Sequence, residues 1–173
     1  KSAEMAAALK ALDERLPLGA NDLQKALDAA RQAYRADSAG RRAIVLIGDG
    51  SSRANLLAPD AFEKLVAGLV TSRAPVIGYG IGPRVDMGTL SALTGRTGGL
   101  VINDTDDASA DSIGAKLSQA VHTGVYWPTA NLKLSEGVEL YPKTTPPLRD
   151  DRDTVLVGAM KGKLPQSVEL GVE

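Results

Sequence analysis

Several residue types that carry chemistry in proteins are absent or scarce in this sequence. Its 173 residues include no cysteine and a single histidine. Disulfides, thiolate nucleophiles, zinc–thiolate sites and histidine-rich metal sites are therefore excluded from this chain. Aromatic residues account for only 3% of it, so a hydrophobic core must be built mainly from alanine, valine, leucine and isoleucine.

The sequence also lacks an excess of either charge and a long apolar run. It has 20 basic residues against 21 acidic ones, a formal net charge of -1. This balance argues against a nucleic-acid-binding surface and against a polybasic membrane anchor. No stretch approaches the roughly 20 consecutive apolar residues of a membrane-spanning helix. We therefore expect neither a nucleic-acid partner nor a transmembrane segment.

The N-terminal part of the sequence predicts two helices. Residues 1–16 are rich in Ala, Leu, Glu and Lys, which favour helices, and they carry one apolar stripe made of Met5, Leu9, Leu12 and Leu16. A second helix follows to about residue 36, capped by Asn21 or Asp22. The chain starts without Met and already inside a helical pattern, so we expect it to be a piece of a longer protein.

Three apolar runs in the middle of the sequence predict buried strands, at 43–47, 75–80 and 100–102. Helical patterns lie between and after them, beginning near Pro59, around 87–93 and from about 108 to 121. Continuous apolar runs are typical of strands buried on both faces of a parallel sheet. The alternation of strands and helices with short connections predicts an α/β fold with a doubly wound sheet over residues 20–121.

After His122 the pattern changes to short strands separated by Gly and Pro. Such strands are predicted at 130–134, 138–141, 154–157 and 168–170, and their composition favours antiparallel pairing. Four short strands are too few for a self-sufficient sandwich, so we expect them to complete a sheet supplied elsewhere. The chain thus divides into an α/β part, 1–122, and a β-rich segment, 123–173.

The candidate binding residues in the α/β part are Asp49 and Asn21. Asp49 ends the first predicted strand, between two glycines, and ligands of open α/β sheets bind outside the carboxyl ends of the strands. A carboxylate at that place suits a hard divalent cation with oxygen ligands. Asn21 offers an amide oxygen at a helix N-terminus. Local roles compete with both assignments, since Asp49 also suits a turn cap and Asn21 a helix cap.

A family resemblance is carried by five short segments that follow one another along the chain. They are Leu18-Gly19-Ala20-Asn21-Asp22, Ile47-Gly48-Asp49-Gly50, Gly78-Tyr79-Gly80-Ile81-Gly82, Val85-Asp86 and Thr97-Gly98-Gly99. In this order they resemble the von Willebrand factor A domain over roughly residues 16–121. The resemblance implies a Rossmann-like parallel sheet with helices on both faces, from which this chain lacks the first strands.

The resemblance further implies a non-enzymatic recognition module for protein ligands, as in cell adhesion. The family builds a metal-ion-dependent adhesion site from three loops, and the first of them, an Asp-x-Ser-x-Ser, does not occur before Gly19. Asp49 and Asn21 match positions in the other two loops. They are the implied metal ligands, for Mg²⁺ in the intact parent protein, where an acidic group of the partner would complete the coordination. The alternative is a degenerate, metal-independent domain. By the same resemblance, a cell-surface or extracytoplasmic location is expected.

Two further expectations concern the parent protein. The family's central first strand is missing, which leaves the strand at 43–47 on an exposed edge, so we expect an upstream segment or fragment to pair with it. In the C-terminal part stand Glu139-Leu140-Tyr141-Pro142, Pro146-Pro147-Leu148 and Asp153–Gly158. They resemble the segment after the A domain in inter-alpha-trypsin inhibitor heavy chains, which implies that 123–173 is part of a hybrid β-sandwich.

An enzyme is the distant alternative. The run Gly78-x-Gly80-x-Gly82 lacks the spacing of a dinucleotide-binding fingerprint, which disfavours a nucleotide-binding enzyme. Ser51 and Ser52 lack the Gly-x-Ser-x-Gly context of an α/β-hydrolase nucleophile, and the one histidine, His122, lies far along the chain at a helix end.

Three remaining features favour structural roles. Trp127 is expected to pack between the two parts of the chain, with stacking on a ligand as the less favoured role. The run 149–153 has mixed charge and predicts a solvated loop. An acidic cluster complements the N-terminus of the helix that follows it, and it consists of Asp104, Asp106, Asp107 and Asp111.

Overall fold

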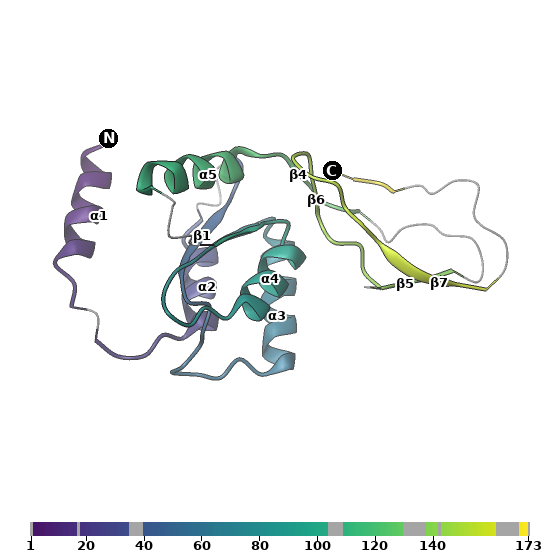
Figure 1. Ribbon diagram of the computed structural model, residues 1–173, viewed down its shortest axis with the longest axis horizontal. Helices are drawn as coiled ribbons and strands as arrows, with labels where there is room; N and C mark the ends of the chain where they lie inside the picture. Colours follow the sequence, from purple (N-terminus) through teal and green to yellow (C-terminus); the bar gives the residue numbers. More distant parts are fainter. Residues whose placement is uncertain are drawn as a thin grey trace.

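The computed structural model describes residues 2–16, 18–34, 40–103, 109–129, 138–141, 143–161 and 170–172. Helices and strands alternate along the first part of the chain, and short strands follow (Figure 1). The helices are α1 (Ala3–Asp13), α2 (Leu23–Gln32), α3 (Pro59–Thr71), α4 (Met87–Arg96) and α5 (Ala110–His122). The strands are β1 (Ile44–Gly48), β2 (Val76–Gly80), β3 (Val101–Asn103), β4 (Val125–Tyr126), β5 (Val138–Tyr141), β6 (Leu148–Arg149) and β7 (Val157–Met160).

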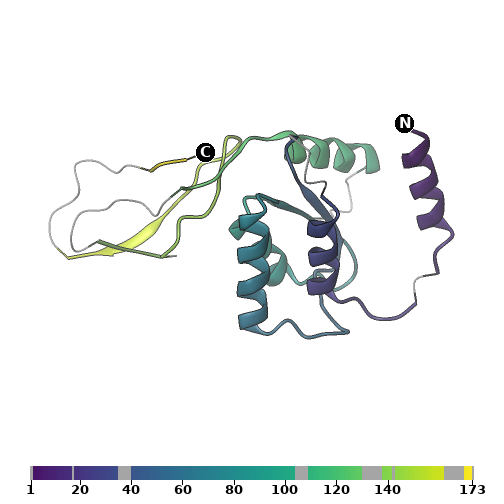
Figure 2. The same ribbon diagram turned by 180° about the vertical axis from the view of Figure 1, so that it is seen from behind.

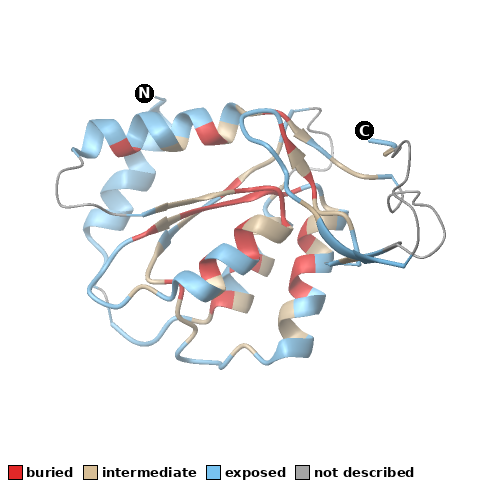
Figure 3. Cartoon of the chain, turned by 45° about the vertical axis from the view of Figure 1, so that its right-hand side comes forward, coloured by how far each residue is buried: buried red, intermediate tan, exposed pale blue. Residues whose placement is uncertain are grey.

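The parallel sheet has the order β1-β2-β3 and winds in one direction. Right-handed crossovers that proceed in one direction place successive helices on the same face. Accordingly, α2, α3 and α4 lie on one side of the sheet and α5 on the other (Figure 3). The predicted mixed α/β class is therefore confirmed. A doubly wound sheet also reverses its strand order, and no reversal occurs among the described strands, so that finer feature stays a prediction.

An apolar core joins α2 and α3 to the first face of the sheet. Apolar residues recur every three or four positions along both helices, which gathers them on one side of each helix. The core consists of Leu23, Leu27, Ile44, Leu65, Val66, Leu69, Ala74, Val76 and Leu93. Aliphatic side chains thus fill the core, as the low aromatic content predicts.

Strand β1 is an open edge of this sheet, because β2 is its only partner among the described strands. Ile44 and Leu46 face the core. Val45 and Ile47, which point to the opposite face, are 41% and 60% exposed, because α5 packs against β2 and β3. The predicted exposed edge is therefore confirmed. The prediction of a strand buried on both faces is wrong for β1.

Helix α1 stands at one end of the molecule, and the C-terminal strands lie at the other (Figures 1 and 2). Ser2 caps α1 by accepting a hydrogen bond from the backbone N–H of Met5, at 3.2 Å. No residue of α1 is buried. Its predicted apolar stripe therefore faces solvent in this chain.

The C-terminal segment forms two small antiparallel pairs, β4 with β6 and β5 with β7. Strand β5 has the predicted bounds, and β7 lies at 157–160 instead of 154–157. The two-residue strands β4 and β6 were not predicted, since two residues are too few to show an alternating pattern. The strand predicted at 130–134 lies outside the described residues, as do the first two residues of the one at 168–170.

A buried guanidinium connects this segment to the α/β part. Arg149, on β6, is only 4% exposed. Its Nη1 donates to the carbonyl of Gly98 at 3.1 Å, and its Nη2 donates to the carbonyl of Ala120 at 3.3 Å. Its Nε and Nη2 also bind the two carboxylate oxygens of Asp151, at 2.8 and 2.6 Å. The prediction of a solvated loop is therefore wrong for Arg149.

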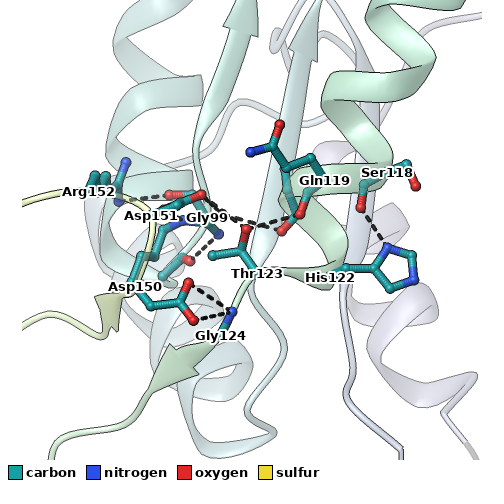
Figure 4. Close-up of polar contacts among 12 residues, drawn as sticks. Gly99, Ser118, Gln119, His122, Thr123, Gly124, Asp150, Asp151 and Arg152 are labelled. Atoms are coloured by element: carbon teal, nitrogen blue, oxygen red, sulfur yellow. Dashed lines mark hydrogen bonds and ion pairs between the residues drawn. The ribbon is translucent and has the colours of Figure 1, made fainter.

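Further polar contacts tie the start of the C-terminal segment, directly after α5, to the residues that follow β6 (Figure 4). The backbone N–H of Gly124 donates to both oxygens of Asp150 at 3.2 Å, and the Thr123 hydroxyl donates to Asp151 at 3.1 Å. The Arg149 guanidinium, above all, holds the pKa of the Asp151 carboxyl below its usual value. Because this pKa is lowered in the folded state, the ion pair stabilises the fold at neutral pH, and its contribution is lost as the pH falls through that lowered value.

Replacing the buried guanidinium should destabilise the protein. In Arg149→Met, two buried carbonyls and Asp151 lose their donor, so we expect the free energy of unfolding to fall by about 3 kcal/mol. Arg152→Met is the matched control, because Arg152 is exposed and donates one hydrogen bond, to Gly99 at 2.9 Å. Its loss should stay below about 1 kcal/mol. Urea denaturation measures both values, and equal losses would contradict the role given to Arg149.

Candidate functional site

The candidate site lies at the carboxyl end of the parallel sheet, where the loops after β1 and β2 meet. Neighbouring parallel strands end at the same edge, so the segments that follow them are brought side by side. The backbone N–H of Ile81 donates to the carbonyl of Gly48 at 3.2 Å, and the N–H of Asp86 donates to the carbonyl of Asp49 at 2.7 Å. These bonds fix the backbone that carries Asp49.

Asn21 joins this edge from the loop before α2. Asp22 caps that helix, since its Oδ1 accepts from the N–H of Lys25 at 2.9 Å, so the choice between the two predicted caps is decided. The Asn21 side chain instead donates through Nδ2 to the carbonyl of Ser51, at 2.7 Å. Its own carbonyl accepts from the N–H groups of Arg53 and Ala54, at 3.0 and 2.9 Å. The two candidate residues are therefore brought together.

Asp49 is held by donors from its own loop. The N–H of Ser51 donates to its Oδ1 at 2.9 Å, which is the turn cap that local reasoning predicts. A guanidinium nitrogen of Arg53 lies 3.5 Å from Oδ2. The Ser51 N–H is the main cause that lowers the pKa of the Asp49 carboxyl, and Arg53 and Asn21 act in the same direction. Asp49 is therefore an anion at neutral pH, with one N–H bound to Oδ1 and the Arg53 guanidinium beside Oδ2.

Sequence reasoning missed Arg53. The sequence does contain a signal for Arg53, because a basic side chain four positions after Asp49 can reach the Asp49 carboxylate across a turn. An acidic and a basic residue four positions apart are nevertheless too common in solvated loops to identify a binding site from the sequence. What distinguishes Arg53 is the structure, which places its backbone against Asn21 and its side chain beside Asp49.

The other polar side chains of this edge are used to hold the loops. Asp86 caps α4 by accepting from the N–H and the hydroxyl of Thr89, at 3.0 and 2.7 Å. The Ser52 hydroxyl accepts from the N–H of Leu23 at 3.0 Å and donates to the carbonyl of Asn55. Within the described ranges, no three His, Asp or Glu side chains are grouped so as to hold a metal ion.

The sole histidine belongs to a different part of the molecule. His122 ends α5, and its Nδ1 lies 2.7 Å from the carbonyl of Ser118, one turn earlier in the same helix (Figure 4). The Ser52 hydroxyl contacts Leu23 and Asn55, and the His122 ring contacts Ser118. The described contacts therefore do not pair Ser52 with His122 as a nucleophile with its base. This contact within its own helix gives His122 a local role.

Gly50 makes the turn after Asp49 possible. It is buried and has φ +74, a left-handed conformation that favours glycine. A Cβ at this position would lie 2.7 Å from Cγ of Leu90 and 3.1 Å from the carbonyl oxygen of Asp86. The loop after β1 therefore packs directly against the start of α4, and this contact sets the position of Asp49.

Comparison with known proteins adds no relative. No protein-family model, no curated protein and no solved structure matches this chain. The resemblance to the von Willebrand factor A domain therefore depends on the five sequence segments and stays a prediction. Within the described ranges, no helix combines the length and the apolar character needed to span a membrane.

A Cβ at position 50 should destabilise the site and the fold together. We expect Gly50→Ala to lower the free energy of unfolding by roughly 1–3 kcal/mol, because it combines a strained φ with a collision against Leu90. Gly48→Ala is the matched control, since a Cβ there meets nothing within 4 Å and its φ is not positive. It should be neutral or slightly stabilising. Thermal or urea denaturation compares the two, and a tolerated Gly50→Ala would contradict the close packing.

Proposed function

We propose that this chain is a non-enzymatic recognition module of the von Willebrand factor A type. Its ligand-binding face consists of the loops 18–22, 49–55 and 81–86. The observation that carries this proposal is the hydrogen bond between the Asn21 side chain and the Asp49 turn, since it joins loops from distant parts of the sequence into one surface. In open α/β sheets, this end of the sheet is where ligands bind.

The proposed face has a cation of its own. The Arg53 side chain is 63% exposed while it lies beside Asp49, so an acidic group of a protein ligand can reach it from solvent. A guanidinium binds carboxylates through two parallel N–H groups. One carboxylate oxygen of Asp49 already accepts an N–H and the other lies beside the Arg53 guanidinium, so a metal ion would compete with that guanidinium. These contacts favour the metal-independent form of the domain, in which Arg53 binds the acidic group that a metal ion binds elsewhere in the family.

The second candidate is a metal-dependent adhesion site that is complete only in the parent protein. It is favoured by the position of Asp49 directly after β1, an open edge of the sheet. A parallel strand from an upstream segment would pair with this edge, and its following loop would add oxygen ligands for Mg²⁺ beside Asp49. If further upstream strands lay beyond that first one, the strand order would reverse beside β1, and open α/β sheets bind ligands at such a switch point.

Binding of an acidic peptide tests the metal-independent form. We expect a capped peptide with one glutamate among alanines to shift the NMR signals of Asn21 and residues 49–55 in the ¹⁵N-labelled chain. Arg53→Ala should weaken this binding roughly three- to tenfold, because an exposed charge pair is lost. Arg15→Ala, also exposed, should leave it unchanged, and the glutamine version of the peptide should not bind. Equal binding by Arg53→Ala would contradict the proposal.

Titration of Mg²⁺ by calorimetry separates the two candidates. We expect no heat that depends on Asp49 from the 173-residue chain, because Ser51 and Arg53 already serve its carboxylate. In the parent protein, heat that disappears in Asp49→Ala supports the metal-dependent site. Absence of heat in both the parent and its variant supports the metal-independent form, whereas Asp49-dependent heat from the chain alone contradicts it.

A further inference from the structure

A cavity of about 490 Å³ lies at the amino-terminal ends of β1 and β2, at the opposite end of the sheet from Asp49. Cavities of several hundred Å³ are of the size that holds small molecules. It is formed between the end of α3, the end of α5 and the segment that leads into β4. The residues that line it are Gly40, Arg41, Arg42, Thr71, Ser72, Arg73, Pro75, Ala120, Val121, Thr123, Gly124, Val125, Tyr126 and Trp127.

The polar wall of this cavity is cationic. Arg41, Arg42 and Arg73 line it, and none of the lining residues that the structure describes is Asp or Glu. Arg41 donates through Nη1 to the carbonyl of His122 at 3.0 Å, and Arg42 donates through Nη1 to the carbonyl of Ser72 at 3.2 Å. These bonds satisfy carbonyls at two helix C-termini, whose partial negative charge would otherwise oppose an anion. They also fix both guanidinium groups, each of which has five N–H donors.

Arg42 is held from a second side as well. Its guanidinium lies over the ring of Tyr34, 5.4 Å from the ring centre. A cation over an aromatic face is attracted by the electrons of the ring. The charge of Arg42 is therefore positioned by a ring on one side and by a carbonyl on the other, so little freedom is lost when an anion binds to it.

Arg73 occupies a backbone position where glycine is the usual residue. It follows α3 with φ +49 and is the one described residue other than glycine with a positive φ. Its N–H bonds the carbonyl of Val70, and the N–H of Ala74 bonds the carbonyl of Leu69, at 2.9 and 3.0 Å. This is the Schellman end of a helix, in which glycine is favoured at the position of Arg73. The side chain of Arg73 borders the cavity.

The remaining wall is apolar and aromatic. Pro75, Val121, Val125, Tyr126 and Trp127 contribute to it. An indole or phenol ring presents a flat face against which another flat group can stack. The cavity thus offers charge-assisted hydrogen bonds on one side and apolar contact on the other.

We propose that this cavity binds a small organic anion, in which a carboxylate or phosphate group is attached to a flat apolar body. Arginines bind both kinds of oxyanion through paired N–H groups, and the aromatic wall takes the apolar body. This site shares no residue with the proposed recognition face. It lies where the α/β part meets the C-terminal segment, so an anion bound there contacts both.

Tryptophan fluorescence provides a direct test, because Trp127 is the only tryptophan of the chain. We expect phenyl phosphate and benzoate to change the emission of the 173-residue chain saturably. Benzamide keeps the ring and lacks the charge, and inorganic phosphate keeps the charge and lacks the ring, so each should bind at least tenfold more weakly than its counterpart. Binding should also weaken as salt is added. No saturable response to either aromatic anion, or equal binding of benzamide, overturns the proposal.

The variant Arg73→Gly separates a binding role from a structural one. It should weaken binding of the aromatic anions roughly tenfold through the lost guanidinium, while the melting temperature stays equal or rises, because glycine fits the left-handed position without strain. Arg53→Ala, in the recognition face, is the matched control and should bind phenyl phosphate unchanged. Unaltered binding by Arg73→Gly, or equal weakening in Arg53→Ala, overturns the assignment.

Discussion

The fold depends on how one buried positive charge is satisfied. Removing a guanidinium from water is costly unless its donors find partners, and Arg149 meets this requirement with one carboxylate and two backbone carbonyls. Those carbonyls belong to the loop before β3 and to the last turn of α5. A single side chain therefore fixes the C-terminal segment, a loop of the sheet and a helix end together. The chain leaves α5 from this point toward Trp127, so the aromatic wall of the cavity is also positioned by the same contact.

Local patterns predict most of the α/β part. The helices and strands between α2 and α5 were expected close to their observed bounds, because apolar periodicity and turn residues act over a few positions. The exposed side of β1 could not be predicted in this way. Val45 and Ile47 belong to a continuous apolar run, and whether such a run is covered on both faces depends on helices elsewhere in the chain. Burial of Arg149 was missed for a similar reason, since its two carbonyl partners lie 29 and 51 positions away and a run of mixed charge usually remains in solvent.

Prediction of the candidate site was limited in the same manner. The sequence placed Asp49 at a strand end and left Asn21 or Asp22 as the helix cap, because both residue types cap helices equally well. Only the tertiary arrangement assigns the cap to Asp22 and the loop contact to Asn21. The cationic cavity had no sequence signal at all. Arg42 and Arg73 are separated by the whole of β1 and α3, and they approach each other because the strands of a parallel sheet begin at one edge.

The position of Arg149 has a consequence for how the molecule is made. The carbonyls of Gly98 and Ala120 are synthesised well before the guanidinium that binds them. Domains fold as units during synthesis, with the N-terminal part first. The carbonyls of Gly98 and Ala120 therefore have no guanidinium partner until Arg149 has left the ribosome, so the contact between the α/β part and the C-terminal segment closes after both have been made.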